Sequence, residues 1–292
     1  MSRYAIVEAP SVLGLFPSGV EHLPEALLHA GLAEGLRARR AGQVTPPQYE
    51  AGVHATSGLQ NPFALRDYAL QLAEVTGTIL DGGEVPIVLG GDCSILLGTL
   101  LALHRRGRYG LLFIDAHADF YGPAADPSGE AASMELALVT GRGPGVVADL
   151  DGTGRLVRDD DVVVVARRDA EEAERDGSPR IEDTAINVID LSDVLARGAT
   201  RAVADALDHL TRPELDGFWL HLDCDAINDA LMPAVDYRLP GGLSWDELTI
   251  ILRAATASGT LVGVEVTIFN PDLDPDGSIA RRLVTCLVDG LR

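Results

Sequence analysis

The sequence has few cysteines, no long apolar run and almost no clustered basic residues, and each shortage excludes a class of protein. Three cysteines in 292 residues do not suggest a disulfide framework. No apolar run approaches the length of a membrane span, and the N-terminus lacks a charged region followed by an apolar signal core. We therefore expect a cytoplasmic protein.

Basic residues are also scarce. The 23 basic residues face 44 acidic ones, the formal net charge is −21, and the only basic cluster is Arg37-Ala38-Arg39-Arg40. This balance disfavours nucleic acid and anionic membranes as partners. The acidity is compatible with a cationic substrate, and a solvated acidic surface explains it equally well.

Apolar β-type runs alternate with helical periodicity along the chain. We expect strands at residues 4–8, 85–89, 110–114, 162–166, 185–189, 218–222 and 261–266, and helices at 23–37, 64–81, 94–106, 200–210, 245–257 and 279–291. This alternation predicts an α/β fold in three layers, with a mainly parallel sheet between helices. Because no linker, repeat or change of composition interrupts it, we expect one domain over residues 1–292.

Two nucleotide-binding motifs that occur on such folds are missing. The first strand is not followed by Gly-x-Gly-x-x-Gly, and there is no phosphate-binding loop with Gly-Lys-Ser/Thr. Ligands of parallel sheets bind at the carboxyl ends of the strands. Those ends are therefore where the functional residues should be sought.

Three segments that end apolar runs carry carboxylates and histidine: Gly90-Gly91-Asp92-Cys93-Ser94, Asp115-Ala116-His117-Ala118-Asp119 and His221-Leu222-Asp223-Cys224-Asp225. Alternate residues of a strand point to one side, so the ligand-type side chains of each segment can converge. Each segment alone could be an ordinary strand end that faces solvent or caps a helix. Together they indicate a cation site, and carboxylates mixed with imidazole suit Mn²⁺, Fe²⁺, Ni²⁺ or Zn²⁺ better than Ca²⁺.

The same segments resemble the motifs of the ureohydrolases, the family of arginase and agmatinase. Asp-Ala-His-Ala-Asp matches directly, while Asp-Cys-Asp stands for Asp-Val-Asp and Gly-Gly-Asp-Cys-Ser for Gly-Gly-Asp-His-Ser. Further similar stretches cover most of the chain: Gly19 to Leu32, Pro233 to Leu243, and Val264-Glu265-Val266 with Asn270-Pro271. The resemblance implies an arginase-like fold whose metal site lies at the carboxyl ends of the strands.

The resemblance also implies a binuclear metal centre. Carried over position by position, one ion would be held by Cys93, Asp115, Asp119 and Asp223, and the other by His117, Asp115, Asp223 and Asp225. The family implies two divalent ions, most of all Mn²⁺, which generate a hydroxide that attacks the guanidine carbon. Asp119 would orient this nucleophile and relay its proton. Glu265 matches the family's glutamate that pairs with the guanidinium, although it could also be a cap or surface carboxylate.

Cys93 is the first departure from the family pattern, because a histidine ligand is usual there. A thiolate ligand favours zinc, iron, cobalt or nickel over manganese, whereas a merely buried thiol would leave its metal site weakened or empty. Gly90 and Gly91 would let the backbone turn sharply before this position. Cys224, between two ligands, should point into the core.

The other departures concern substrate recognition. The loop that supplies a proton-shuttling histidine in arginases has Ala132 at that position, so the shuttle is absent; Ser128 matches, and Glu130 replaces an asparagine. Glu130 could pair with a cationic tail or be solvated. Where relatives carry Gly-Thr-Pro, this chain has Tyr237, which could contact the reacting group, and Arg238, which could bind a carboxylate or pair with a surface acid.

The sequence therefore predicts a hydrolase of linear C–N bonds in a small guanidino or amidino substrate, of arginase or agmatinase type. A formimino-acid hydrolase, with Arg238 on the substrate carboxylate, is the alternative activity. A catalytically impaired family member with a binding or assembly role is the alternative without activity. The resemblance alone implies a homo-oligomer, a trimer or a hexamer.

Overall fold

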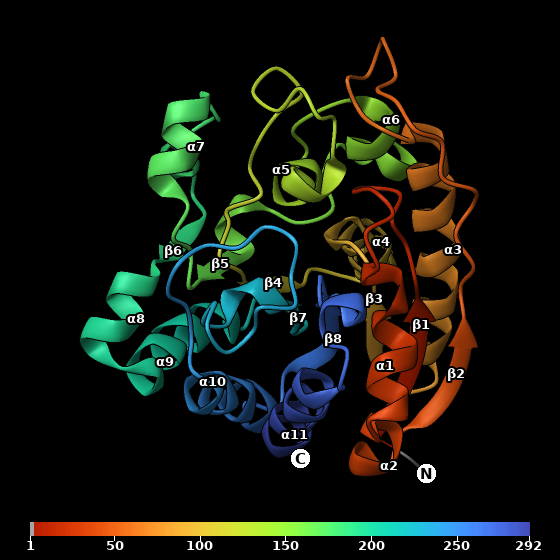
Figure 1. The fold of residues 1–292 in the computed structure, drawn as a ribbon. Helices are drawn as coiled ribbons and strands as arrows, with labels where there is room; N and C mark the ends of the chain where they lie inside the picture. The colour runs from red at the N-terminus through yellow and green to blue at the C-terminus, as the bar shows by residue number, and fades with distance from the viewer. Residues whose placement is uncertain (1–2) are drawn as a thin grey trace.

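Residues 3–292, which the computed structural model describes, form one sheet of eight parallel strands between two layers of helices (Figure 1). The strand order is β2-β1-β3-β8-β7-β4-β5-β6. The strands are β1 (Tyr4–Ala9), β2 (Arg39–Gln43), β3 (Val85–Gly90), β4 (Gly110–Ile114), β5 (Val162–Val165), β6 (Asn187–Ile189), β7 (Phe218–Asp223) and β8 (Leu261–Thr267). The predicted three-layer α/β class is confirmed.

Helices cover both faces of this sheet and form two separate apolar cores with it. One face packs against α1 (Leu23–His29), α2 (Leu32–Leu36), α8 (Leu191–Arg197), α9 (Ala199–Leu210), α10 (Trp245–Ala257) and α11 (Ser278–Leu291). The other packs against α3 (Pro62–Asp81), α4 (Leu96–His104), α5 (Glu135–Val139) and α6 (Gly145–Ala148). Helix α7 (Ala170–Asp176) buries none of its residues. Within residues 3–292, no helix is both long and apolar enough to cross a membrane.

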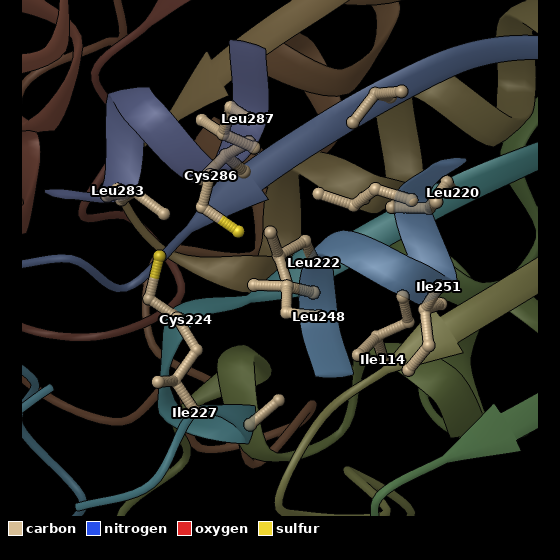
Figure 2. Close-up of a cluster of buried hydrophobic side chains, with 14 of the residues drawn as sticks. Ile114, Leu220, Leu222, Cys224, Ile227, Leu248, Ile251, Leu283, Cys286 and Leu287 are labelled. Atoms are coloured by element: carbon tan, nitrogen blue, oxygen red, sulfur yellow. The ribbon is translucent and has the colours of Figure 1, made fainter. Parts of the chain in front are cut away.

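Strand alternation explains how a single strand serves both cores. Leu220 and Leu222 of β7 lie with α10 and α11 side chains such as Leu248 and Leu287 (Figure 2). Trp219 directly precedes Leu220, so its side chain points to the opposite face and belongs to the core on the α3 and α4 side. The side chains at positions 221 and 223 must therefore point to the same face of the sheet as Trp219.

Every expected strand and helix is found near its expected bounds, but the short helices α5, α6, α7 and α8 and one strand were not expected. The helix expected at 23–37 is split into α1 and α2, because Gly31 adopts a φ of 94° between them. Strand β2 was not expected: its sequence is Arg-Arg-Ala-Gly-Gln, and most of it is exposed at the sheet edge. The strand expected at 162–166 ends at Val165, where Ala166 takes a φ of 76°.

The strand order decides where a site can form. Strands β8 and β7 are inserted between β3 and β4, so the carboxyl ends of β3, β8, β7 and β4 stand side by side. The chain builds the sheet outward in opposite directions from this central group of strands, and open parallel sheets bind ligands at such a switch point. All three acidic motifs follow strands of this group.

Candidate metal centre

Each predicted ligand emerges from the carboxyl end of a central strand. Cys93 starts a 3₁₀ turn (Cys93–Ile95) after β3, Asp115 directly follows β4, and Asp223 is the last residue of β7. Their side chains are almost completely buried. The Cys93 thiol donates to Asp223 Oδ2 at 2.8 Å and lies 3.1 Å from the Thr267 hydroxyl at the end of β8. Three strands thus meet at one point.

The turn that carries Cys93 depends on close backbone packing. A Cβ on Gly91 would overlap the carbonyl oxygen of Ser11 and lie 2.9 Å from its carbonyl carbon. Asp92 then anchors the turn, since its carboxylate accepts from Ser94 N at 2.9 Å and from Ser11 Oγ at 3.0 Å. Neither Gly90 nor Gly91 has a positive φ. Glycine is required here for close approach, and not for the sharp turn expected from the sequence.

The ligand-type atoms fall into three overlapping groups within residues 3–292, each confined to 4.8 Å. They are Cys93 with Asp115, His221 and Asp223; Cys93 with Asp115, Asp119 and Glu135; and Asp115 with His117 and Asp225. Ligands of a single ion lie at most about 4.6 Å apart when metal–ligand bonds are about 2.0–2.3 Å. All six ligands predicted from the sequence are therefore brought together, and Asp115 belongs to every group.

The electrostatics of this cluster demand positive charge. Burial and the neighbouring Asp225 raise the pKa of Asp115 to about 6. Burial, with Glu135 beside Asp119 and Asp225 beside Asp223, raises the pKa of both carboxyls well above their usual range. A bound cation would stabilise the charged forms of these carboxyls and so lower their pKa again.

On the other side of the cluster, the imidazole of His117 and the carboxylate of Asp225 stabilise each other's charged form. His117 Nδ1 lies 2.9 Å from Asp225 Oδ2 and 3.7 Å from Asp115 Oδ1. Burial opposes the charged form of His117, yet Asp225 raises the pKa of the imidazole well above its usual value. Burial also opposes the charged form of Asp225, yet the charge and hydrogen bond of His117, together with Asp223 and Arg168, leave the pKa of this carboxyl below its usual value. This imidazole and carboxylate face one another as two ligands of one cation would.

Several buried polar atoms of the cluster have no hydrogen-bond partner in the described part of the chain. They are Asp115 Oδ2, His221 Nε2 and both carboxylate oxygens of Glu135. Unpaired buried polar atoms are rare because each costs about 1–3 kcal/mol. Four such atoms beside a thiol and further carboxylates fit divalent metal ions, which would satisfy them. The donor set is therefore suited to the binuclear centre that the resemblance implies.

Two members of the cluster, His221 and Glu135, were not identified from the sequence. His221 lies two residues before Asp223 on β7, so strand alternation alone would place both on one side. Glu135 opens α5 after the long loop, and nothing local marks it as a neighbour of Asp119. Cys224, by contrast, is buried in the core on the α10 and α11 side as predicted (Figure 2).

The role predicted for Glu265 is wrong in this geometry. Glu265 is 0% exposed, its Oε1 lies 2.7 Å from His221 Nδ1, and its Oε2 accepts from Thr99 Oγ1 at 2.8 Å. Strand β8 continues to Thr267, so Glu265 lies two residues below the strand end. The residue that reaches the cavity from this strand end is Ile268, which is apolar.

A cavity of about 420 Å³ opens above the cluster. Its floor includes Cys93, His117, Asp119, Asp223 and Asp225, and its walls carry five further carboxylates, those of Asp126, Glu130, Asp169, Glu172 and Asp176. Among the described residues, no arginine lines it, and the sequence contains no lysine. The cavity is therefore strongly acidic from floor to mouth.

Two loops meet across the mouth of this cavity. The Tyr237 hydroxyl donates to Glu130 Oε2 at 2.8 Å, which joins the loop after β7 to the loop after β4. Burial raises the pKa of Glu130. Ser128 also lines the cavity, and its Oγ accepts from Glu130 N at 3.1 Å. Ser128, Glu130 and Tyr237 thus lie where the sequence placed substrate contacts.

Arg238 does not lie there, and its predicted carboxylate-binding role is wrong. Its side chain is 47% exposed outside the cavity and pairs with Asp229, with Nε donating to Oδ1 at 2.5 Å. The neighbouring Tyr237 already turns toward Glu130, so the chain presents Arg238 to solvent. The surface alternative stated from the sequence is the one observed.

Three of the six non-glycine residues with a positive φ in the described part of the chain lie at the carboxyl ends of strands on this side of the sheet. Asp119, Ala166 and Ile268 follow β4, β5 and β8, and they adopt φ values of 43°, 76° and 69°. A left-handed conformation costs about 1–2 kcal/mol per residue, and it is most unusual for a β-branched residue such as isoleucine. Such strain persists where surrounding structure holds it, and it gathers at functional sites.

A parallel sheet whose central strand ends gather a thiol, imidazoles and carboxylates beneath an acidic cavity defines a metal-dependent α/β enzyme. Comparison with known proteins identifies the family, because the model of the arginase family matches residues 2–291. The chain belongs to the arginase family.

The similarity to its relatives extends over nearly the whole length of both chains. The arginase of Brevibacillus brevis is 29% identical over 291 residues, covering 97% of this chain and 95% of the relative. The arginase of Staphylococcus aureus strain COL is 28% identical over 288 residues, covering 96% and 94%. The solved structure of Bacillus caldovelox arginase superposes with a TM-score of 0.91 at 27% identity, covering 100% of this chain and 98% of that one.

Proposed function

We propose that this protein is a binuclear metal-dependent hydrolase that cleaves a C–N bond of a small guanidino compound. The observation that carries the proposal is the convergence of six carboxylate, imidazole and thiol ligands, five of which line the floor of one cavity. The relatives named as arginases support the reaction class.

The residues at the floor of the cavity would hold the metal ions and position the nucleophile. Two divalent ions held by Cys93, Asp115, His117, Asp119, Asp223 and Asp225 would lower the pKa of a shared water and supply the nucleophile at neutral pH. Asp119 both belongs to this set and lines the cavity, so its carboxylate is placed to orient the nucleophile and pass a proton to the leaving amine.

The charge of the cavity favours a substrate that is cationic at both ends. An amine near Glu130 would meet the carboxylates of the cavity wall, whereas an α-carboxylate there would lie among like charges, with no arginine or lysine among the described lining residues to pair with. With Arg238 paired outside the cavity, the basis for a formimino-acid substrate is lost. We therefore rank agmatine-like guanidino amines above free arginine for this chain.

Activity and metal content test the proposal together. Protein purified without chelator should contain close to two divalent ions per chain and release urea from a guanidino amine. Agmatine should exceed arginine in kcat/KM by about tenfold or more, the scale of one unfavourable buried charge contact. No metal and no urea would favour the impaired family member, and a preference for arginine would refute the argument from cavity charge.

The metal, the compartment and the assembly are also part of the proposal. The resemblance favours Mn²⁺, while the Cys93 thiol favours Zn²⁺, Fe²⁺, Co²⁺ or Ni²⁺. A cytoplasmic homo-oligomer, a trimer or hexamer, is proposed on the resemblance alone. Light scattering that finds a stable monomer at micromolar concentration would contradict the assembly.

A further inference from the structure

His221 occupies a position where strand geometry turns it into the metal cluster. It is 0% exposed, and its neighbours Leu220 and Leu222 point to the opposite side of β7, toward α10 and α11 (Figure 2). The imidazole stacks on Phe113 of β4, with ring centroids 4.5 Å apart and planes 8° apart. Packing therefore fixes the plane of the imidazole ring.

Hydrogen bonds then decide which ring nitrogen is free. His221 Nδ1 lies 2.7 Å from Glu265 Oε1, and Thr99 Oγ1 donates to the other oxygen of the same carboxylate at 2.8 Å. A carboxylate is an acceptor, so it keeps the proton on Nδ1 and leaves the lone pair on Nε2. This carboxylate–imidazole arrangement is the one that orients histidine ligands in metalloproteins.

The free nitrogen faces other groups that need a cation. Among the described residues His221 Nε2 has no hydrogen-bond partner, nor has Asp115 Oδ2, which lies 3.9 Å away. Two acceptors facing one another in a buried site repel unless something positive lies between them. Ligands about 2.1 Å from a common ion lie about 3–4 Å apart, which matches this separation.

We propose that His221 Nε2 is a ligand of the ion that Cys93, Asp115 and Asp223 also hold, and that Glu265 is its positioning residue. This inference rests on the proposed function, since it concerns the same centre. The nitrogen ligand that the family pattern places at the position of Cys93 would be supplied here by β7, which is separated from β3 by β8. The resulting set of one thiolate, one imidazole and two carboxylates suits Zn²⁺ or Co²⁺.

Cadmium-113 tests the ligand directly in the intact wild-type protein. Metal-free protein is loaded with ¹¹³Cd²⁺, and scalar coupling between the metal and the histidine ring protons is measured by NMR, with His221→Gln used to assign the signal. Coupling to the His221 ring is the expected result. Bound cadmium with coupling to His117 but not to His221 would overturn the inference and leave the proposed function standing. Failure to bind any metal would refute both.

Metal titration tests the positioning role of Glu265. Glu265→Gln keeps the shape but cannot hold Nδ1–H in the same way, and affinity for Zn²⁺ at one of the two sites should fall about 10- to 100-fold. Trp219→Phe is the matched control, because Trp219 lies on the same side of the same strand and is equally buried. Its zinc affinity should stay within about twofold of wild type. Equal affinities for wild type and Glu265→Gln would overturn the role of Glu265.

Discussion

Replacing Gly91 by alanine probes the turn that carries Cys93 into the metal centre. The added Cβ would overlap the Ser11 carbonyl, and the backbone on both sides is anchored. Ser11 O accepts from Asp92 N at 2.9 Å, and Gly91 O accepts from Ile268 N at 2.9 Å. The methyl group can be accommodated only if the turn moves away from Ser11.

The expected cost follows from these contacts. Separating the turn from Ser11 weakens two buried hydrogen bonds at about 1 kcal/mol each. The residual overlap adds the cost of an overpacked core, about 1–3 kcal/mol. We expect a loss of about 3–5 kcal/mol, which for a chain of this size lowers Tm by about 5–8 °C. Cys93 lies two residues along the turn, so metal affinity should fall as well.

Gly90→Ala is the matched control. Its Cβ would overlap the end of the Ile95 side chain, which can turn aside, and would lie 3.3 Å from Ile95 Cγ1. A cost of about 1 kcal/mol and nearly unchanged metal content are expected. Thermal denaturation of both metal-free variants, followed by metal titration, measures the difference. If Gly91→Ala melts within a degree of wild type, or if Gly90→Ala is the more damaging change, the close-approach argument is refuted.

Three further predictions concern the ligands, the cavity mouth and the fold. Asp223→Ala should lose most bound metal and all hydrolysis, and full metal occupancy by elemental analysis would sink the ligand assignment. Glu130→Gln should raise KM for agmatine about tenfold or more by removing a charge-assisted contact, while Arg238→Ala should leave KM unchanged; similar effects of both would contradict the cavity assignment. Asp161→Asn should cost about 1–3 kcal/mol in urea unfolding, because this buried carboxylate accepts three hydrogen bonds from two part-exposed arginines. An unchanged unfolding midpoint would contradict that value.

Local pattern was sufficient for the longer helices, for seven of the eight strands and for most of the ligand set. A run of four valines such as Val162 to Val165 is typical of a parallel strand that is buried on both faces. The helix expected at 245–257 is α10, with the same bounds. Asp115, His117 and Asp223 could be identified because strand ends of a parallel sheet share one edge. These inferences need only residues that are close in sequence.

The tertiary structure decided which strands are neighbours and how far each one runs. Because β8 extends to Thr267, Glu265 lies roughly 7 Å below the strand end and serves His221 instead of a substrate. Glu135 reaches Asp119 only through the path of a long loop. Arg238 is drawn to Asp229 at the surface. Each of these outcomes depends on contacts between residues distant in sequence or on the exact end of an element, and hydrophobic periodicity carries no information about either.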